Sequence, residues 1–341
     1  MLRQLRVQNV RNHHDGIFEF SPTTTVIIGS NGIGKTSLLE AIYIAYRGAS
    51  FRGSDKDIIR VESPWYRIDL KDEEFQRIVK FRTDHDTKQK SFTIDNKNFI
   101  RLPLKYKRPI VLFSPEDLQL LSGSPSRRRK YIDTILSQLD TKYASVLRRY
   151  ERALHQRNKL LKLPGSKADT FFSWNIMLSE YGAYITASRK RLIEQMNELL
   201  TAKYQSIAQK QDVIDISYSH AAHTSHYLLA EYEKNFERDR LYGSTSTGPH
   251  RHDMIINMND KYAADTASRG ENRTIILSLK SIEADIITRI DQQPLILLDD
   301  VYGELDSDRQ YSLKNVFDGF QTIITSTHDV QAADSTIITL N

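Results

Sequence analysis

Residues 29–36 read Gly-Ser-Asn-Gly-Ile-Gly-Lys-Thr and match the phosphate-binding pattern G-x-x-x-x-G-K-[ST]. In this pattern the glycines let successive backbone N–H groups turn toward phosphate oxygens, and the N-terminus of the following helix adds partial positive charge. Lys35 is expected to reach the β- and γ-phosphates, and the hydroxyl of Thr36 to bind Mg²⁺. We therefore expect ATP with Mg²⁺, held by Gly29, Ser30, Asn31, Gly32, Ile33, Gly34, Lys35 and Thr36.

A second group of candidate residues ends the apolar run Leu-Ile-Leu-Leu-Asp-Asp at 295–300. A strand that ends in two acids projects carboxylates from the edge of a parallel sheet where ligands bind. This arrangement resembles a Walker B motif, in which Asp299 binds Mg²⁺ directly or through water and Asp300 orients the attacking water or accepts its proton. Two acids at a strand end are more often simply solvated. Their combination with the loop at 29–36 favours the functional reading.

Both motifs need a sheet to position them, and the surrounding sequence predicts one. The β-branched run at 23–28 is typical of a buried strand that enters the loop, and residues 35–47 have apolar positions at helical spacing. Further strands are expected at 2–7, within 66–113, at 295–298 and at 322–325, and a further helix near 271–290. This pattern predicts an α/β fold.

The middle of the chain has a different character. Two long stretches, 127–163 and 171–211, have helical periodicity and are separated by Leu-Pro-Gly-Ser. They predict an antiparallel helical lobe at 121–212. The alternating residues at 213–218 are expected to return the chain to the first domain, which would comprise 1–120 and 213–341. The predicted fold is a mixed sheet with flanking helices and an inserted helical lobe.

Composition excludes several classes of protein. The chain has no cysteine, which rules out disulfides and thiolate metal sites, and no apolar run long enough to span a bilayer. The first residues lack the apolar core of a secretory signal, so the cytoplasm is the expected location and no membrane partner is expected. Residues 127–162 carry eleven Lys or Arg against three acids, net +8 in a chain of net +5, which indicates a polyanionic partner.

Three further features resemble ABC-type ATPases. Residues 268–271, Ser-Arg-Gly-Glu, stand before a helix of about 20 residues and resemble the signature motif, with Ser268, Gly270 and Glu271 presented to an anion. Taken alone they fit an ordinary helix cap equally well. Residues 303–306 resemble the D-loop, with Asp306 at the dimer interface, and His328 after the strand at 322–325 resembles the switch histidine that contacts the γ-phosphate.

Several short strings narrow the resemblance to the RecF family of bacterial recombination-repair ATPases. They are residues 5–12, with Arg11 and Asn12 where related proteins contact nucleotide, then 113–118 with 126–133, and finally 247–251 with Asp253. Two positions depart from the family pattern. Arg269 stands where glutamine is common, and His252 where an acid is common. The first departure touches the expected contact across a dimer and leaves the expected ATP site intact.

The resemblance implies a protein that binds single-strand and duplex DNA in an ATP-dependent way. It would act at single-strand gaps or stalled forks with RecR and RecO, and help to place RecA. ATP bound at residues 29–36 of one copy would be closed over by residues 268–271 of the other, which gives a two-fold homodimer. Family members hydrolyse ATP weakly and DNA stimulates them, so hydrolysis would time the release of the dimer.

Three other interpretations share parts of this pattern. A transporter-type ABC subunit would need a helical lobe shaped for a membrane partner, which the basic window argues against. A chromosome-scaffolding head of the SMC or Rad50 kind would need far longer helices than the roughly 60 Å that 40 residues give. A nucleotide-gated DNA-binding module that does not hydrolyse ATP stays open from sequence, and measuring ATP turnover with and without DNA would test it.

Overall fold

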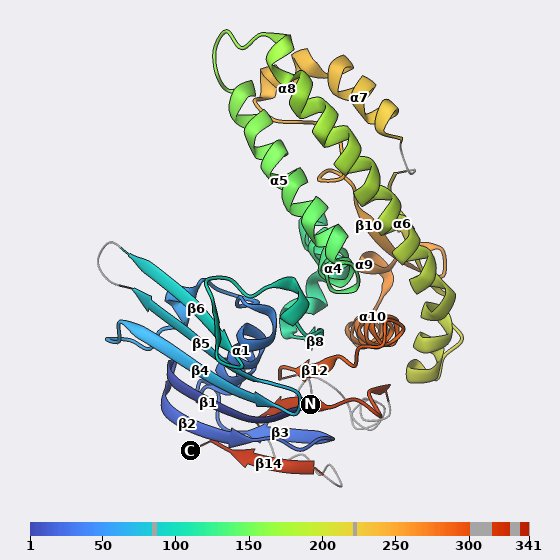
Figure 1. Cartoon of the computed structure of the whole chain (residues 1–341). Coiled ribbons are helices and arrows are strands. Elements are labelled where there is room, and N and C mark those ends of the chain that lie inside the picture. The colour runs from blue at the N-terminus through green and yellow to red at the C-terminus, as the bar shows by residue number, and fades with distance from the viewer. Residues whose placement is uncertain (84–86, 221–223, 301–315, 328–334, 341) are drawn as a thin grey trace. The chain divides into compact units, whose positions relative to one another are not determined.

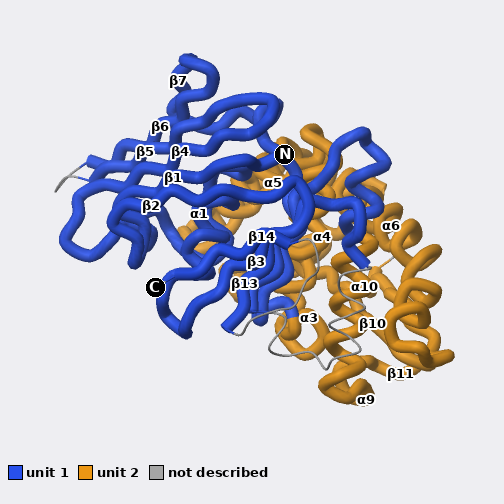
Figure 2. Tube along the Cα trace, turned by 90° about the horizontal axis from the view of Figure 1, so that it is seen from below, with its two compact units in different colours: residues 1–117, 283–341 blue, residues 118–282 orange. Residues whose placement is uncertain are grey.

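The computed structural model describes residues 1–83, 87–220, 224–300, 316–327 and 335–340. The chain forms two compact units, shown in different colours in Figure 2. Unit 1 comprises Met1–Asp117 and Glu283–Asn341, and unit 2 comprises Leu118–Ile282. None of the helices in these described ranges combines the length and apolar character needed to cross a membrane.

Unit 1 contains a five-stranded sheet in the order β14-β3-β13-β12-β8, in which every pairing is parallel. In chain order the strands are β3 (Thr24–Ile28), β8 (Ile110–Phe113), β12 (Leu295–Leu298), β13 (Thr322–Ser326) and β14 (Ser335–Thr339). All residues of β12 and β13 are buried, as expected for parallel strands covered on both faces. Because the strands are parallel, the carboxyl ends of β3, β12 and β13 meet at one edge of the sheet.

A second sheet of unit 1 is antiparallel, in the order β2-β1-β4-β5-β6-β7. The strands are β1 (Leu2–Val10), β2 (His13–Glu19), β4 (Trp65–Asp72), β5 (Gln76–Thr83), β6 (Lys88–Ile94) and β7 (Lys97–Phe99). Burial alternates along β4 and β5, so one face of this sheet is covered and the other is more exposed. The short α2 (Asp55–Ile58), η1 (Leu104–Tyr106) and η2 (Pro115–Leu118) lie in the connections.

Helix α1 (Lys35–Arg47) contacts strands of both sheets of unit 1. Ten of its 13 residues are buried, and Leu38, Ile42 and Ala45 belong to one apolar core with residues of β1, β4 and β12. Each fully buried leucine or isoleucine stabilises the fold by about 1.5–3 kcal/mol. The core therefore fixes α1, and with it the loop that precedes the helix.

Unit 2 is mainly helical (Figure 1). It contains α3 (Gln119–Ser122), α4 (Pro125–Leu139), α5 (Thr141–Leu161), η3 (Ala168–Phe171), α6 (Phe172–Ala208), α7 (Ser225–Lys234), α8 (Phe236–Tyr242), α9 (Ala263–Thr266) and most of α10 (Arg269–Thr288). Helices α5 and α6 pack against each other in antiparallel directions, which confirms the predicted helical hairpin. The first predicted helix is in fact two, because Asp140 leaves the helical conformation and caps α5 by accepting a hydrogen bond from the backbone N–H of Lys142.

The strand predicted at 213–218 is present as β9 (Ile214–Tyr218), but it does not return the chain to unit 1. It pairs with β10 (Met254–Met258), which pairs with β11 (Lys261–Tyr262), and this three-stranded sheet belongs to unit 2. Side chains of α6 cover the outer edge of β9. Asn197 exchanges two hydrogen bonds of 2.8 Å with the backbone of Ile216, and Thr201 binds the backbone of Ile214. Unit 2 therefore extends well beyond residue 212.

Together the two units confirm the predicted fold class, an ABC-type ATPase fold with a helical lobe. The strands expected at 295–298 and 322–325 are β12 and β13, and the helix expected near 271–290 is α10. The elements that were not predicted include the strands β2, β10, β11 and β14 and the helices α7 and α8.

Candidate nucleotide-binding site

The loop between β3 and α1 is built to leave backbone N–H groups available. The residue before α1 is Gly34, with a φ of 114° that side chains other than glycine rarely adopt. No side chain caps α1, and its first turn has no acid. A Cβ atom at Gly34 would lie 2.5 Å from Nε2 of His13. The sequence therefore keeps the start of α1 open to an anion, as helix N-termini that bind phosphate require.

Lys35 is buried, at 4% exposure, yet its ammonium group stays within the loop. Nζ donates hydrogen bonds to the carbonyl oxygens of Gly29, at 2.8 Å, and Ser30, at 3.2 Å. It also lies 3.9 Å from Oδ1 of Asp300. The ammonium group of Lys35 thus lies between the backbone of its own loop and the carboxylate of Asp300, the second acid of the pair.

The other acid, Asp299, is joined to the loop by a direct contact. Oδ1 of Asp299 accepts hydrogen bonds from the hydroxyl of Thr36, at 2.8 Å, and from that of Thr325, at 2.9 Å. The Thr325 hydroxyl in turn accepts the backbone N–H of Asp300 at 2.8 Å. Burial raises the pKa of Asp299, and the two threonine hydrogen bonds oppose that rise.

This set of groups fits Mg²⁺, which prefers oxygen ligands and usually binds proteins through one or two carboxylates together with substrate phosphates. Thr36 and Asp299 would supply the protein oxygens. A bound cation would also neutralise the buried Asp299 carboxylate and remove part of the cost of its desolvation. Mg²⁺, when bound, would neutralise charge on phosphate oxygens.

The turn between β1 and β2 contacts the phosphate-binding loop from the side. The side-chain amide of Asn12 donates to the carbonyl of Gly32 at 2.5 Å, and Nε2 of His13 lies 3.1 Å from the carbonyl of Gly34. These contacts join two carbonyl groups of the loop, those of Gly32 and Gly34, to the β1–β2 turn. Asn12, which sequence patterns predicted as a nucleotide contact, supports the loop in the structure, and His13 is a neighbour that the sequence motifs did not reveal.

Arg11, the other residue predicted at this turn, is engaged by an acid of α1. Its guanidinium forms two hydrogen bonds with the fully buried carboxylate of Glu40, at 3.0 and 3.2 Å. Arg52 binds the same carboxylate at 3.2 Å, and Ser50 donates its hydroxyl to it. Glu40 thus anchors two arginines next to the helix that carries Lys35 and Thr36. Neither Glu40 nor Arg52 belongs to a motif that sequence analysis identified.

The signature-like residues stand at the start of α10, in unit 2. The hydroxyl and backbone N–H of Ser268 donate to the Glu271 carboxylate at 2.8 and 2.9 Å, and the backbone N–H of Glu271 donates to the Ser268 hydroxyl at 3.3 Å. Lys210 also binds Glu271, at 2.6 Å. The hydrogen bond from Lys210 has the largest effect on the pKa of Glu271. Together with the hydrogen bonds from the backbone and hydroxyl of Ser268 it lowers this pKa to about 2. The geometry is a reciprocal capping box.

The side chain of Ser268 is exposed and Gly270 is half-buried, so this helix start faces solvent in the described part of the chain. The remaining predicted site residues, Asp306 and His328, lie outside the described residues.

Of the eleven basic residues of 127–162, two are buried, seven are exposed, and Arg127 and Arg129 are half-buried. Arg128 forms an ion pair with Asp253 at 2.8 Å, and Arg157 one with Asp239 at 2.7 Å, and both arginines are buried. These arginines stabilise unit 2. The exposed members are Lys130, Lys142, Arg148, Arg149, Arg152, Lys159 and Lys162.

The positive charge is not confined to that window, because a second basic stretch lies in unit 1. Residues 76–108 carry ten Lys or Arg against three acids, net +7. The basic window at 127–162 is therefore one of two candidate surfaces for a polyanionic partner.

Comparisons with known proteins identify the family of the chain. Residues 4–238 match the family model of an AAA domain. The chain is 33% identical to a protein of Lachnoclostridium phytofermentans called "DNA replication and repair protein RecF", over 96% of this chain and 92% of the relative. A solved structure of "the recombination mediator protein RecF-ATPrS in RecFOR pathway" is 30% identical, with a TM-score of 0.86 over 99% of this chain and 96% of that one. The structure of "RecF-ATP" in the same pathway matches with the same identity and TM-score, over 97% and 93%.

Proposed function

Because the chain belongs to the RecF family of DNA replication and repair proteins, we propose that it binds ATP with Mg²⁺ at residues 29–36 and that ATP joins two copies of it on DNA. The observation that carries the proposal is the 2.8 Å contact between Thr36 and Asp299. It brings together a loop and a strand end that are 263 residues apart in sequence, in the arrangement that a nucleotide with its metal requires.

The second half of each ATP site would come from the partner copy. Unit 1 would supply the phosphate-binding loop, and unit 2 the start of α10, with Ser268, Gly270 and Glu271 facing the γ-phosphate of the other copy. Asp306 and His328 would complete the seam. The exposure of Ser268 supports this role, since a helix start that faces solvent can meet a second molecule. Without the γ-phosphate the two copies would separate.

Hydrolysis would end the dimeric state. Asp300 would orient water or accept its proton, and Lys35 would stabilise charge on the phosphates. The half-exposed Asp300 carboxylate and its 3.9 Å separation from Lys35 are consistent with both roles. Turnover would be slow and stimulated by DNA, so that hydrolysis limits the time the protein stays on DNA.

DNA would be bound through phosphate charge, with the exposed basic residues of 127–162 and of 76–108 as the candidate surfaces. The structural relatives are named as members of the RecFOR pathway. For this chain we propose action at single-strand gaps in the cytoplasm, together with RecR and RecO, to help load RecA after DNA damage.

Sizing by light scattering with ATP, ADP or no nucleotide, with and without gapped duplex, tests the scheme. The wild-type chain should dimerise only with ATP, and Lys35→Ala should stay monomeric because it no longer binds ATP. Asp300→Asn should accumulate as an ATP-bound dimer, because it binds but does not hydrolyse. An Asp300→Asn variant that binds ATP and stays monomeric would refute the dimer mechanism.

A further inference from the structure

One end of unit 2 carries four exposed apolar side chains. Leu163 (57% exposed) and Phe172 (54%) flank the turn between α5 and α6, and Leu241 (80%) and Tyr242 (71%) end α8. Single exposed apolar residues are ordinary, but a group of them on one surface marks an interaction site.

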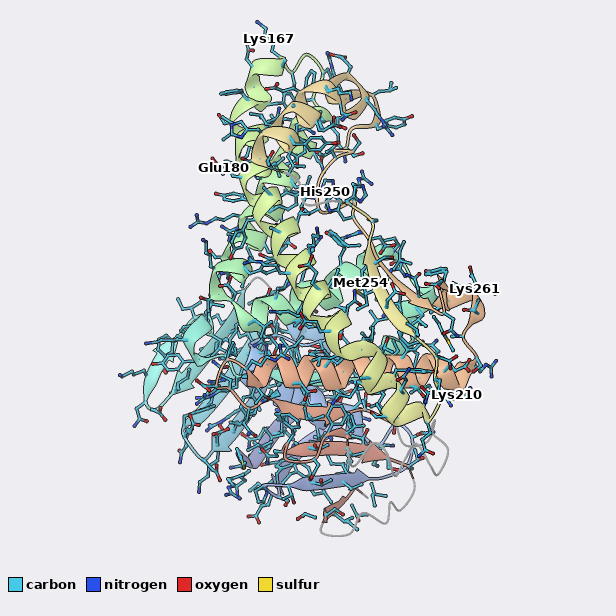
Figure 3. All side chains as sticks on the ribbon, turned by 90° about the vertical axis from the view of Figure 1, so that its right-hand side faces the viewer. Lys167, Glu180, Lys210, His250, Met254 and Lys261 are labelled. Atoms are coloured by element: carbon cyan, nitrogen blue, oxygen red, sulfur yellow. The ribbon has the colours of Figure 1, made fainter. Side chains whose placement is uncertain are left out.

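The two segments lie against each other at both ends of α8. At its start, the ring of Phe236 packs edge-on against Phe171, with centroids 5.0 Å apart. Past its end, a Cβ at Gly243 would lie 3.1 Å from Cγ of Lys162. Figures 1 and 3 both show α8 beside the α5–α6 turn. In Figure 3 the label of Lys167 marks this turn. We call Leu163, Phe172, Leu241 and Tyr242 the arm-tip patch.

A buried polar network holds α8 in place beneath the patch. Arg157 of α5 and Asp239 of α8 form a fully buried ion pair at 2.7 Å, and Arg157 also donates to Asn175 and Thr245, both at 2.8 Å. Removing one partner of such a pair leaves an uncompensated buried charge, so the arrangement is specific. The arm-tip patch is therefore a rigid surface, and binding to it costs little ordering of the protein.

The surroundings of the patch are basic. Five exposed cations lie on the same two segments, against two exposed acids, Asp169 and Glu237. Asp239 adds no free negative charge because Arg157 neutralises it. The cations are Lys159, Lys162, Lys167, Arg238 and Arg240. Complementarity therefore requires a negatively charged partner that also offers apolar side chains.

We propose that the arm-tip patch docks an acidic, amphipathic segment of a partner protein. Single-stranded nucleic acid fits less well, because half of the patch is leucine, which cannot stack on bases as aromatic rings do. A lipid surface also fits less well, because α8 has seven residues, far shorter than the amphipathic helices of about 20–30 residues that commonly lie in membranes. This site goes beyond the proposed ATP-dependent dimer and uses none of its ATP-site residues, and it shares only Lys159 and Lys162 with one candidate DNA surface.

Fluorescence anisotropy on the full chain without nucleotide tests the proposal. The probes are two labelled 16-residue peptides of glutamate with leucine and phenylalanine, at helical spacing in one and alternating in the other. At least one should bind, and Leu241→Ser/Tyr242→Ser should raise its Kd at least tenfold. Ile100→Ser is the matched control, because Ile100 is an equally exposed apolar residue (84%) of unit 1, and its Kd should stay within twofold of wild type.

The same variants should be titrated with a 20-nucleotide oligo-dT and with vesicles containing anionic phosphatidylserine. If the double variant lowers binding to either of these and leaves peptide binding unchanged, the patch serves nucleic acid or lipid and the proposal is wrong. It is also wrong if neither peptide binds the wild type. Because nucleotide is absent, each of these results is independent of whether ATP dimerises the protein.

Discussion

The starts of α1 and α10 are both expected to meet phosphate, yet the chain builds them in opposite ways. Helix α1 begins after Gly34 in a left-handed conformation, with no side-chain cap and no acid in its first turn. Helix α10 begins with a closed capping box, in which Ser268 and Glu271 satisfy each other and Lys210 neutralises the acid. The start of α1 is open to an anion, whereas at the start of α10 the N–H groups of Ser268 and Glu271 are already bonded by side chains of the same helix start.

This difference indicates that the two helix starts take part in binding in different ways. The start of α1 needs no rearrangement to bind phosphate, so it provides a preformed binding site. At α10 the Glu271 carboxylate accepts hydrogen bonds from the hydroxyl and N–H of Ser268, so a phosphate that binds these two groups must replace it. In the proposed dimer, breaking these bonds offsets part of the binding free energy. The α10 contact therefore stabilises the dimer by less than its number of hydrogen bonds suggests.

The substitution expected to have the largest effect on phosphate binding at the uncapped start of α1 is Gly34→Ala. A Cβ there would lie 2.5 Å from Nε2 of His13, and φ is 114°, so the loop must distort. We expect ATP affinity to fall about a thousandfold, or about 4 kcal/mol. Titration with a fluorescent ATP analogue measures this. Gly32→Ala is the control, because Gly32 also has a positive φ but nothing lies within 4 Å of its Cβ position, so its loss should be much smaller.

The second test removes the hydroxyl that links the two acids. Thr325→Val leaves a buried carboxylate oxygen and the N–H of Asp300 each without one hydrogen bond, which costs roughly 2–3 kcal/mol of stability. Urea denaturation measures it, and Thr325→Ser should restore most of the loss. The dependence of ATP binding on Mg²⁺ should weaken in the same variant. Equal stability of Thr325→Val and wild type would contradict the role assigned to this hydroxyl.

The third test concerns the turn that supports the open start. His13→Ala removes the contact with the Gly34 carbonyl and should lower ATP affinity about tenfold, near the 0.5–1.5 kcal/mol of one hydrogen bond. His13→Gln, which can still donate, should recover part of the affinity. Thermal unfolding of both variants separates this effect from a general loss of stability. If His13→Ala lowers the melting temperature and leaves ATP affinity unchanged, the residue only stabilises the fold.

Sequence patterns located the parts of the site that lie within one local motif. The loop at 29–36 and the acids at 299 and 300 were predicted, because strand-loop-helix order and an apolar run before two acids are visible within a few residues. Thr325 and His13 were not assigned a role, since their function depends on which strands lie side by side. The parallel register that places Thr325 next to the acids is a property of the folded sheet.

The fold shows the same division between local and distant contacts. The alternation at 213–218 correctly indicated a strand, but not the sheet it joins. Side chains of α6 supply hydrogen bonds to its outer edge, and Asn197 does so as a neighbouring strand would. Likewise, the helical period continues through residue 140, and only the side chain of Asp140 and its contacts end one helix and begin the next. Such side-chain to backbone contacts leave no periodic signal in the sequence.

The smallest expected effect concerns the closed start of α10. The pKa of Glu271 is lowered from 4.5 to about 2, so its charged form stabilises the fold above pH 4.5 and this contribution is lost as the pH falls toward 2. Because Lys210 is half exposed, the contribution is modest, and Glu271→Gln should cost about 1 kcal/mol at pH 7.

Urea denaturation of wild type and Glu271→Gln between pH 7 and pH 3 measures the difference, which should shrink below pH 4.5. ATP affinity of the single chain should stay within twofold of wild type, because the open start of α1 does not use this residue. Ser268→Ala provides the companion variant, since it opens the same box from the other side. If Glu271→Gln instead abolishes ATP binding by the monomer, the two helix starts share one site within a single chain, and the contrast between them fails.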